Sequence, residues 1–313
     1  MISIVIPVLN EEQNLLPLHQ EIDEVLRSSG LQAEIIIVDD GSNDESWKEV
    51  TDLARRDPRV QGIRFRRNFG KAAALSAAFA CVRGEFIITL DADLQDSPSE
   101  IPRMIRQLES GFDLVNGWKR RRFDPWHKVV PSRIFNWMIR LSSGLNLHDH
   151  NCGLKAYRVD VVREIRIYGE LHRFITLLAH ARGFRVTETE VQHRPRVHGK
   201  SNYGVERFIK GLLDLLTVRV LTMFGERPLH FLGATGLVAF GVGFVGLAYL
   251  AWLWMTGHRP IGTRPVLIYS VASLLLGAQM MAAGILAELI VSRSGGGRDS
   301  PRSYSIAERV GFR

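Results

Sequence analysis

The fold of this chain is decided by the stretch Phe86-Ile-Ile-Thr-Leu-Asp91-Ala-Asp93-Leu-Gln95-Asp96. Its first five residues are apolar or β-branched and predict a buried strand, which ends at two carboxylates separated by one residue. In an open α/β sheet, ligands bind beyond the carboxyl ends of the strands, so these acids lie where a site is expected. Close carboxylates repel each other and favour a cation, and oxygen ligands suit Mg²⁺ or Mn²⁺ bound with a diphosphate. An exposed Asp-x-Asp turn is the alternative, and the rest of the chain must decide between them.

Strands and helices alternate through the first half of the chain, which predicts a mostly parallel, Rossmann-like, three-layer α/β domain. Apolar runs predict strands at residues 2–8, 34–38, 60–65 and 86–90, and helical spacing predicts helices at 14–27, 45–56 and 72–82. The following part is less regular. We expect strands at 113–117 and 186–191 and a helix at 132–141.

Two long uncharged runs lie near the end of the 313-residue chain, at residues 231–255 and 265–287. Each is long enough to cross a hydrocarbon core of about 30 Å as a helix. The link between them, residues 256–264, is polar and contains Pro and Gly. These features predict a transmembrane hairpin, and a pair of fully buried soluble helices is the alternative.

The distribution of basic residues predicts the orientation of this hairpin. Basic residues precede the first run and follow the second, whereas the link carries only Arg259 and Arg264. The positive-inside rule therefore places the N-terminal domain and the tail in the cytoplasm, in a multi-pass protein of the inner membrane. Ile2 begins a strand directly, so no signal peptide is expected. Cys81 and Cys152 form no metal or disulfide pattern and fit a reducing compartment.

These patterns divide the chain into four regions. Residues 1–203 form the predicted cytoplasmic α/β domain, and 204–228 an amphipathic helix lying along the membrane surface. Residues 229–291 form the hairpin, and 292–313, rich in Gly, Ser and Arg, a disordered basic tail. Small residues in the hairpin can pack helices together, which leaves a homo-oligomer open: Gly243, Gly246, Ala278 and Ala282.

Four motifs at successive strand ends, taken together, resemble a known family. They are Ile4-Val-Ile-Pro-Val-Leu-Asn-Glu11, Val38-Asp-Asp-Gly-Ser42, Arg67-Asn-Phe-Gly-Lys71 and Leu90-Asp-Ala-Asp-Leu-Gln-Asp96. In this order they resemble family-2 glycosyltransferases of the GT-A fold. The match is closest to the polyprenyl-phosphate hexosyltransferases, the dolichol-phosphate mannose synthase-like branch. It covers residues 1–225 by motif and the hairpin by architecture.

The resemblance implies a metal-dependent, inverting transferase. It would move a hexose from a UDP- or GDP-sugar to polyprenyl phosphate, of the undecaprenyl type, at the cytoplasmic membrane face. Besides donor, acceptor and membrane lipids, it implies a separate flippase or downstream transferase as a partner, because a short hairpin does not easily form a sugar channel. No nucleic-acid motif is present, and no nucleic-acid partner is expected.

The motifs also predict the residues that bind the donor. Asp39 or Asp40 would accept hydrogen bonds from the base or ribose, while Asp91, Asp93 and Gln95 would hold the Mg²⁺ or Mn²⁺ ion on the diphosphate. The remaining nucleotide-sugar contacts would come from Pro7, Asn10, Glu11, Ala92, Gly70 and Lys71, the last two at a helix N-terminus. Singly, each motif is also explained as a turn, a helix cap or a loop.

Basic residues predict the acceptor site, because a lipid phosphate needs cationic donors. The resemblance assigns this role to Arg133, Arg196, Lys200 and Ser201, with Arg120 from a basic turn beside them. A solvated basic face attracted to lipid headgroups is the alternative for some of them.

The catalytic residues implied are Asp93 and Asp149, the latter matching an acid suggested to orient or deprotonate the acceptor. Glu170 and His172 are the alternatives to Asp149. The chain contains no Glu-Asp pair, which many family-2 enzymes use as a base. A phosphate acceptor is already anionic at neutral pH, so this absence favours it.

Other functions compete with this interpretation. A processive polysaccharide synthase would need a Gln-x-x-Arg-Trp motif, and a nucleotidyltransferase a Gly-rich loop near the N-terminus; the sequence has neither. A family-2 transferase acting on another lipid or glycan acceptor stays open. A non-catalytic membrane protein that binds nucleotide or anionic lipid also stays open. The net charge of +7 favours this alternative.

Overall fold

The computed structural model describes residues 1–120, 139–140, 145–165, 167–195, 228–258, 260–294 and 306–310. The chain divides into two compact units. One comprises Met1–Val218 with Pro301–Arg313, and the other Arg219–Ser300. We describe each by itself.

The first half of the α/β unit follows the predicted alternation. Its elements are β1 (Ile2–Val8), α1 (Glu12–Ser29), β2 (Ala33–Asp39), α2 (Ser46–Arg56), β3 (Val60–Phe65), α3 (Lys71–Phe79) and β4 (Phe86–Thr89). The predicted strands and helices are all confirmed, with ends that shift by a few residues. Helix α3 begins immediately after Gly70, whose φ of 94° lies in the region that glycine favours.

The second half contains more elements than the sequence predicted. After the 3₁₀ turn η1 (Pro98–Glu100) come α4 (Ile101–Glu109), β5 (Leu114–Trp118), β6 (Lys155–Arg158), α6 (Val159–Glu164), η2 (Leu171–Phe174), α7 (Ile175–Ala181) and β7 (Val186–Glu190). Strands β5 and β7 confirm two predictions, whereas α4, β6, α6 and α7 were not predicted. The helix predicted at 132–141 and the amphipathic helix at 204–228 lie almost wholly outside the described residues.

The strands form one eight-stranded sheet in the order β7-β5-β6-β4-β1-β2-β3-β8, where β8 is Ile306–Val310. Strands β1, β2, β3 and β4 run parallel. Their carboxyl ends therefore meet at one edge, where residues 7–11, 39–46, 66–71 and 90–96 follow them. Strand β6 pairs antiparallel with both β4 and β5, so the sheet is mixed on that side.

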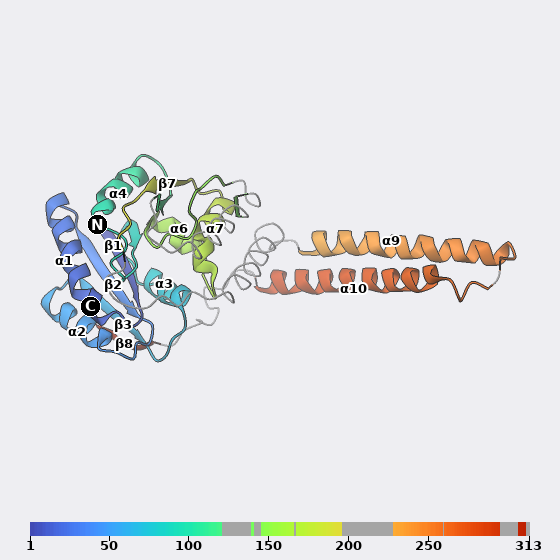
Figure 1. Ribbon diagram of the computed structural model, residues 1–313, viewed down its shortest axis with the longest axis horizontal. Coiled ribbons are helices and arrows are strands. Elements are labelled where there is room, and N and C mark those ends of the chain that lie inside the picture. The colour runs from blue at the N-terminus through green and yellow to red at the C-terminus, as the bar shows by residue number, and fades with distance from the viewer. Residues whose placement is uncertain are drawn as a thin grey trace. The chain divides into compact units, whose positions relative to one another are not determined.

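Helices cover both faces of the sheet, giving the predicted three layers (Figure 1). Helices α1, α2 and α4 bury their apolar side chains against one face, with Ile4, Ile6 and Ile37 of the strands. Helices α3, α6 and α7 pack on the other face, against Val5 and Ile36. Because side chains of a strand alternate between faces, β1 and β2 contribute to both cores. Each large apolar side chain buried this way contributes roughly 1.5–3 kcal/mol.

Part of the C-terminal tail is ordered, although the sequence predicted a disordered tail. Residues 306–310, predicted to be disordered, form β8, which pairs antiparallel with the edge strand β3. The reason is that β3 offers a row of unpaired backbone groups, and a short segment of alternating character completes them. Composition alone does not reveal such a partner, which lies far away in the sequence.

The second unit is a helical hairpin of α9 (Pro228–Met255) and α10 (Pro265–Ser294) (Figure 1). Segments Leu229–Met255 and Pro265–Ile290 are long and apolar enough to span a membrane, and only 11% of each hydrophobic window is buried. This exposure differs from that of a soluble core helix and supports membrane anchoring. Gly243 and Gly246 pack against α10 of the same hairpin, where an added Cβ would meet Leu274 or Ser270. These two small residues thus serve the hairpin itself.

Candidate functional site

The loops after β1 and β2 are held together by hydrogen bonds. The amide of Asn10 donates to Ser42 Oγ at 2.9 Å, and the amide of Asn43 donates to Asn10 Oδ1 at 2.9 Å. Asn10 adopts a φ of 56°, in a region that Asn tolerates better than most residues. The amide of Glu11 donates to Ser46 Oγ. Pro7, one register position from the end of β1, pairs with Val38. The structure thus brings Pro7, Asn10 and Glu11 to the end of β2.

Asp39 and Asp40, which the sequence could not distinguish, have different surroundings. Asp40 Oδ1 and Oδ2 accept hydrogen bonds from the amides of Phe69 and Gly70 at 2.7 and 2.9 Å. Burial raises the pKa of Asp40, although these hydrogen bonds oppose the shift. Its carboxylate anchors the loop before α3. Asp39 accepts one hydrogen bond, from Ser42 N, while its buried Oδ2 has no hydrogen-bond partner within the described part of the chain.

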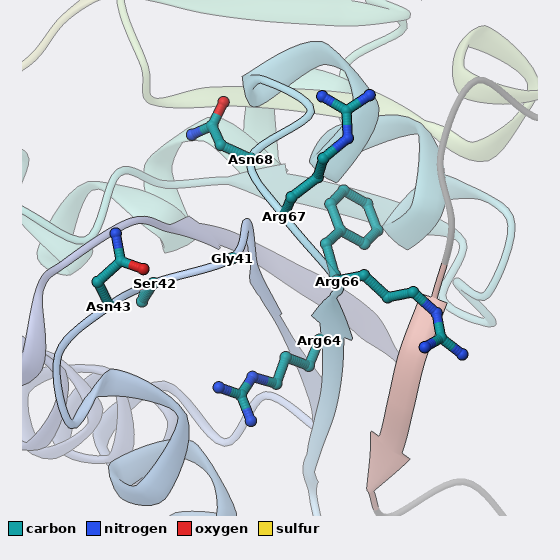
Figure 2. Close-up of a pocket in the computed structure, with 8 residues that line it drawn as sticks. Gly41, Ser42, Asn43, Arg64, Arg66, Arg67 and Asn68 are labelled. Atoms are coloured by element: carbon teal, nitrogen blue, oxygen red, sulfur yellow. The ribbon is translucent and has the colours of Figure 1, made fainter.

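A groove of about 580 Å³ opens beside Asp39, between residues 41–43 and 64–68 (Figure 2). Arg64 Nε lies 3.5 Å from Asp39 Oδ2. Arg64 and Arg66 point to opposite sides of β3, Arg66 toward β8 (Figure 2). Arg67 stacks its guanidinium over the Phe69 ring at 4.4 Å. The groove combines cations with amide and hydroxyl groups and suits an anionic, hydrogen-bonding ligand.

Asp91, the first carboxylate after β4, is paired with a lysine. Lys71 Nζ donates a hydrogen bond to Asp91 Oδ1, and both side chains are about one-third exposed. Burial raises the pKa of Asp91, but the ammonium groups of Lys71, Lys119 and Lys155 outweigh it and lower the pKa to about 2. Asp93 is buried, and its Oδ1 accepts a hydrogen bond from Gln95 N at 3.2 Å. The residues predicted to bind metal therefore lie together at this edge.

Three further charged side chains, Lys119, Asp96 and Lys155, are buried or partly buried around Asp91 and Asp93. Lys119 Nζ lies 2.7 Å from Asp96 Oδ1, and burial raises the pKa of Asp96. Lys155 is buried, which lowers its pKa, and its Nζ donates to the carbonyl of Cys152. Burial raises the pKa of Cys152 to about 12, so its thiol stays protonated. Cys152 is a free, buried cysteine of the core.

Gly153 lies directly against Asp91. A Cβ at this position would stand 2.3 Å from Asp91 Oδ2 and 2.6 Å from its Cγ. Thr89, the last residue of β4, donates a hydrogen bond from its Oγ1 to the Gly153 carbonyl at 3.0 Å. The peptide at residue 153 thus forms a wall that limits where the Asp91 carboxylate can turn.

The three residues considered as a base, Asp149, Glu170 and His172, all lie in described segments. Asp149 is buried and accepts a hydrogen bond from Asn151 N at 3.0 Å. Glu170 pairs with Arg173 at 2.7 Å. Burial, with the positive charges of Lys71 and Arg173, lowers the pKa of His172 well below its ordinary value, so this imidazole is neutral. His150 hydrogen-bonds Thr176 Oγ1 at 3.1 Å, and burial lowers its pKa to about 4.

Of the predicted acceptor residues, only Arg120 is described. Arg133, Arg196, Lys200 and Ser201 lie outside the described residues. Arg120 Nη1 lies 3.4 Å from Glu190 Oε2, and its guanidinium is 6.0 Å from the Trp118 ring centroid. Trp118 in turn stacks on His148 with ring centroids 4.2 Å apart.

The chemistry of the acidic edge fits a hard divalent cation. Its donors are oxygens, and the ammonium of Lys71 already occupies a cation position against Asp91. In the described ranges, however, no group of three or more His, Cys, Asp or Glu side chains is arranged to hold an ion. Asp91 and Asp93, with the Gln95 carbonyl, would therefore hold Mg²⁺ or Mn²⁺ only together with oxygens from a ligand.

Comparison with known proteins decides the family. The model of glycosyl transferase family 2 matches residues 3–166, which contain the four strand-end motifs. The chain belongs to this family. Members that resemble it include dodecaprenyl-phosphate galacturonate synthase of Rhizobium johnstonii, 37% identical over 92% of this chain and 87% of the relative. Undecaprenyl-phosphate 4-deoxy-4-formamido-L-arabinose transferase of Edwardsiella ictaluri is 35% identical over 92% of this chain and 88% of the relative.

Solved structures confirm the GT-A fold. Glucosyl-3-phosphoglycerate synthase from Mycobacterium tuberculosis, in complex with phosphoglyceric acid, aligns with a TM-score of 0.55 at 18% identity. The alignment covers 71% of this chain and 79% of that one. The same enzyme in complex with Mn²⁺, UDP-glucose and phosphoglyceric acid aligns with a TM-score of 0.54 at 17% identity.

Several residues of the site were missed by sequence reasoning. The groove arginines Arg64 and Arg66 belong to a strand and its end, where the apolar pattern predicted a strand but no site, and Arg67 was part of a quoted motif without an assigned role. Lys119 and Gly153 come from segments whose contacts with Asp96 and Asp91 are set by the fold alone. The sequence signal for Gly153 was its position four residues after Asp149, a candidate catalytic residue.

Proposed function

We propose that this protein transfers a sugar from a UDP- or GDP-sugar to a polyprenyl phosphate at the cytoplasmic face of a membrane. The observation that carries the proposal is the convergence of Asp91 and Asp93 with the Lys71 ammonium and the basic groove at one sheet edge. The two relatives named above act on dodecaprenyl and undecaprenyl phosphate by their names, and this chain covers most of each.

The groove accounts for the nucleoside end of the donor. The buried Oδ2 of Asp39 offers an acceptor for a ribose hydroxyl or a base N–H, and satisfying it removes an unfavourable buried group. Arg64 and Arg67 contribute positive charge beside it. Asp40 acts indirectly, by holding the Phe69 and Gly70 amides that place Lys71.

Asp91, Asp93 and Gln95 account for the diphosphate end. A bound Mg²⁺ or Mn²⁺ supplies Lewis acidity that stabilises negative charge on the departing diphosphate. Lys71 is the described cation closest to Asp91 and is suited to bind phosphate oxygens as a compact point charge.

The reaction requires one displacement. An oxygen of the acceptor phosphate bonds to the anomeric carbon while the bond from that carbon to the donor diphosphate breaks, and its electrons leave with the nucleoside diphosphate. The configuration at the anomeric carbon inverts. Because the second pKa of a phosphate monoester is about 6, the acceptor needs no strong base at neutral pH. Asp93 and Asp149 are proposed as the catalytic carboxylates, Asp149 to orient the acceptor.

The hairpin of α9 and α10 would anchor the domain in the membrane, with both chain ends in the cytoplasm, as the basic flanks predict. The donor sugar is proposed to be a hexose. Because the relatives' names include galacturonate and a formamido-arabinose, the test must include uronic acid and pentose donors.

A transfer assay in detergent tests the proposal. Purified protein receives Mg²⁺ or Mn²⁺, undecaprenyl phosphate and a panel of radiolabelled UDP- and GDP-sugars, with EDTA controls. We expect label to enter the lipid phase from one donor, and EDTA to prevent it. Metal-dependent binding of a nucleotide without transfer would leave the fold but exclude this acceptor. If no nucleotide binds, a non-catalytic lipid-binding protein becomes the better interpretation.

A further inference from the structure

We propose that Lys71 is a built-in counter-ion of Asp91 that moves to the donor diphosphate, so that the divalent ion and the nucleotide bind as one unit. This inference rests on the function proposed above and adds an order to its binding steps. When no donor is bound, the protein should have low affinity for the metal ion, because the Lys71 ammonium already neutralises the Asp91 carboxylate.

The position of Lys71 is specified by the fold. It is the first residue of α3, and the preceding amide of Gly70 donates to Asp40 Oδ2 at 2.9 Å. This anchor lies at the end of β2, and the lysine reaches past β1 to the end of β4, where its Nζ binds Asp91 Oδ1. Gly153 covers the other carboxylate oxygen, Oδ2. Asp91 is therefore enclosed from both sides, yet the pair is about one-third exposed and within reach of a ligand.

The surrounding charges are nearly balanced without any metal. Lys119 pairs with Asp96, and Lys155 lies close enough to Asp91 and Asp149 to feel both charges. Among the described residues, three ammonium groups (Lys71, Lys119 and Lys155) thus face four carboxylates (Asp91, Asp93, Asp96 and Asp149). His172 is neutral, and Arg173 pairs with Glu170. A dication alone would leave this partly buried region with excess positive charge, which is costly at low dielectric. A diphosphate brings the negative charge that restores the balance.

The protein ligands are also too few. Mg²⁺ and Mn²⁺ prefer about six oxygens, and the described side chains provide no cluster of three or more acidic, His or Cys ligands. One oxygen of Asp93 already accepts the Gln95 amide. Such an ion, held by one or two carboxylates, would complete its coordination shell with water and with phosphate oxygens of the donor. When Asp91 is taken by the ion, Lys71 is released next to those same phosphates, where it regains an anionic partner.

Manganese binding tests this exchange separately from turnover. Full-length protein in detergent is titrated with Mn²⁺, with free Mn²⁺ read by electron paramagnetic resonance, alone and with saturating UDP or GDP. Wild type is compared with Lys71→Gln, with Lys71→Arg, which keeps the charge, and with Lys48→Gln. Lys48 is an exposed lysine of α2 that pairs with the exposed Glu45, and it serves as the matched control.

We expect the matching diphosphate to tighten Mn²⁺ binding to wild type at least tenfold, within the usual range of coupling between two sites. Lys71→Gln should bind Mn²⁺ alone several-fold more tightly than wild type and lose most of this coupling. By reciprocity, Mn²⁺ should then also improve its diphosphate affinity less. Lys71→Arg and Lys48→Gln should resemble wild type.

The counter-ion role is overturned if Lys71→Gln binds Mn²⁺ alone no better than wild type while the diphosphate still promotes binding; the proposed function then stands. If neither UDP nor GDP promotes Mn²⁺ binding to wild type, both proposals fail. Because the Lys71 side chain is partly exposed, its replacement should leave the melting temperature unchanged. If Lys71→Gln does not fold, Lys71→Met, of similar length, takes its place with the same expected result.

Discussion

Replacing Gly153 by alanine tests whether the wall beside Asp91 is needed for the site. The added Cβ would stand 2.3 Å from Asp91 Oδ2, where ordinary contacts begin at about 3.4 Å. The carboxylate must therefore move by roughly 1 Å, which also removes its hydrogen bond to Lys71. A displacement of about 1 Å in a reacting site can reduce the rate on the order of 100-fold. We expect a loss of that size in transfer.

The same change should affect stability much less. The backbone at Gly153 does not have a positive φ, so alanine introduces no backbone strain there. Overpacking a buried site costs about 1–3 kcal/mol, and the neighbouring atoms here belong to a side chain that can turn. We expect the melting temperature to fall by a few degrees, with weaker Mn²⁺ binding in the presence of UDP or GDP.

The assay compares label transfer, Mn²⁺ affinity and thermal unfolding of Gly153→Ala with those of Gly262→Ala. Gly262 lies in the link between α9 and α10, where an added Cβ meets nothing within 4 Å. It should behave as wild type. A folded Gly153→Ala protein with wild-type turnover and Mn²⁺ binding would show that the position of Asp91 does not limit the reaction.

Three further predictions follow from particular contacts. Asp93→Ala should abolish transfer while the protein stays folded and membrane-bound, whereas Asp160→Ala, at an exposed position of α6, should retain activity; normal turnover of the first variant would exclude the metal assignment. Asp57 is buried, which raises its pKa, but hydrogen bonds from Arg59 and His19 lower it to about 2. Its ionised form therefore stabilises the fold by about 2 kcal/mol above pH 4, and this contribution is lost as the pH falls toward 2. Asp57→Asn should unfold at lower urea concentration than wild type at pH 7, and this difference should shrink as the pH falls toward 2; an equal difference at pH 7 and near pH 2 would contradict this. Arg64→Ala should weaken UDP or GDP binding at least fivefold, since a charge-assisted contact contributes about 1.5 kcal/mol or more, and Arg106→Ala on α4 should not; unchanged affinity would remove the groove from the donor site.

The sequence by itself determined the layer architecture and the edge that carries the site. Runs of apolar residues and helical spacing are local signals, and each specified a strand or helix of the first half within a few residues. The Asp91-Ala-Asp93 motif could be placed at a strand end because the strand itself is so plainly apolar. The hairpin was equally evident, since two uncharged runs of membrane length seldom occur in a chain that does not enter a bilayer.

What only the tertiary structure decided concerns contacts between distant segments. Asp39 and Asp40 are neighbours of one type, yet Asp40 anchors the Phe69–Gly70 backbone, whereas Asp39 is fully buried with its Oδ2 3.5 Å from Arg64 Nε. The pairing of Lys71 with Asp91, the approach of Gly153 and the addition of β8 to β3 join segments that no local pattern connects. Residue periodicity reports which face of an element is buried, but not which side chain will lie opposite. The chemistry of this site depends on that second fact.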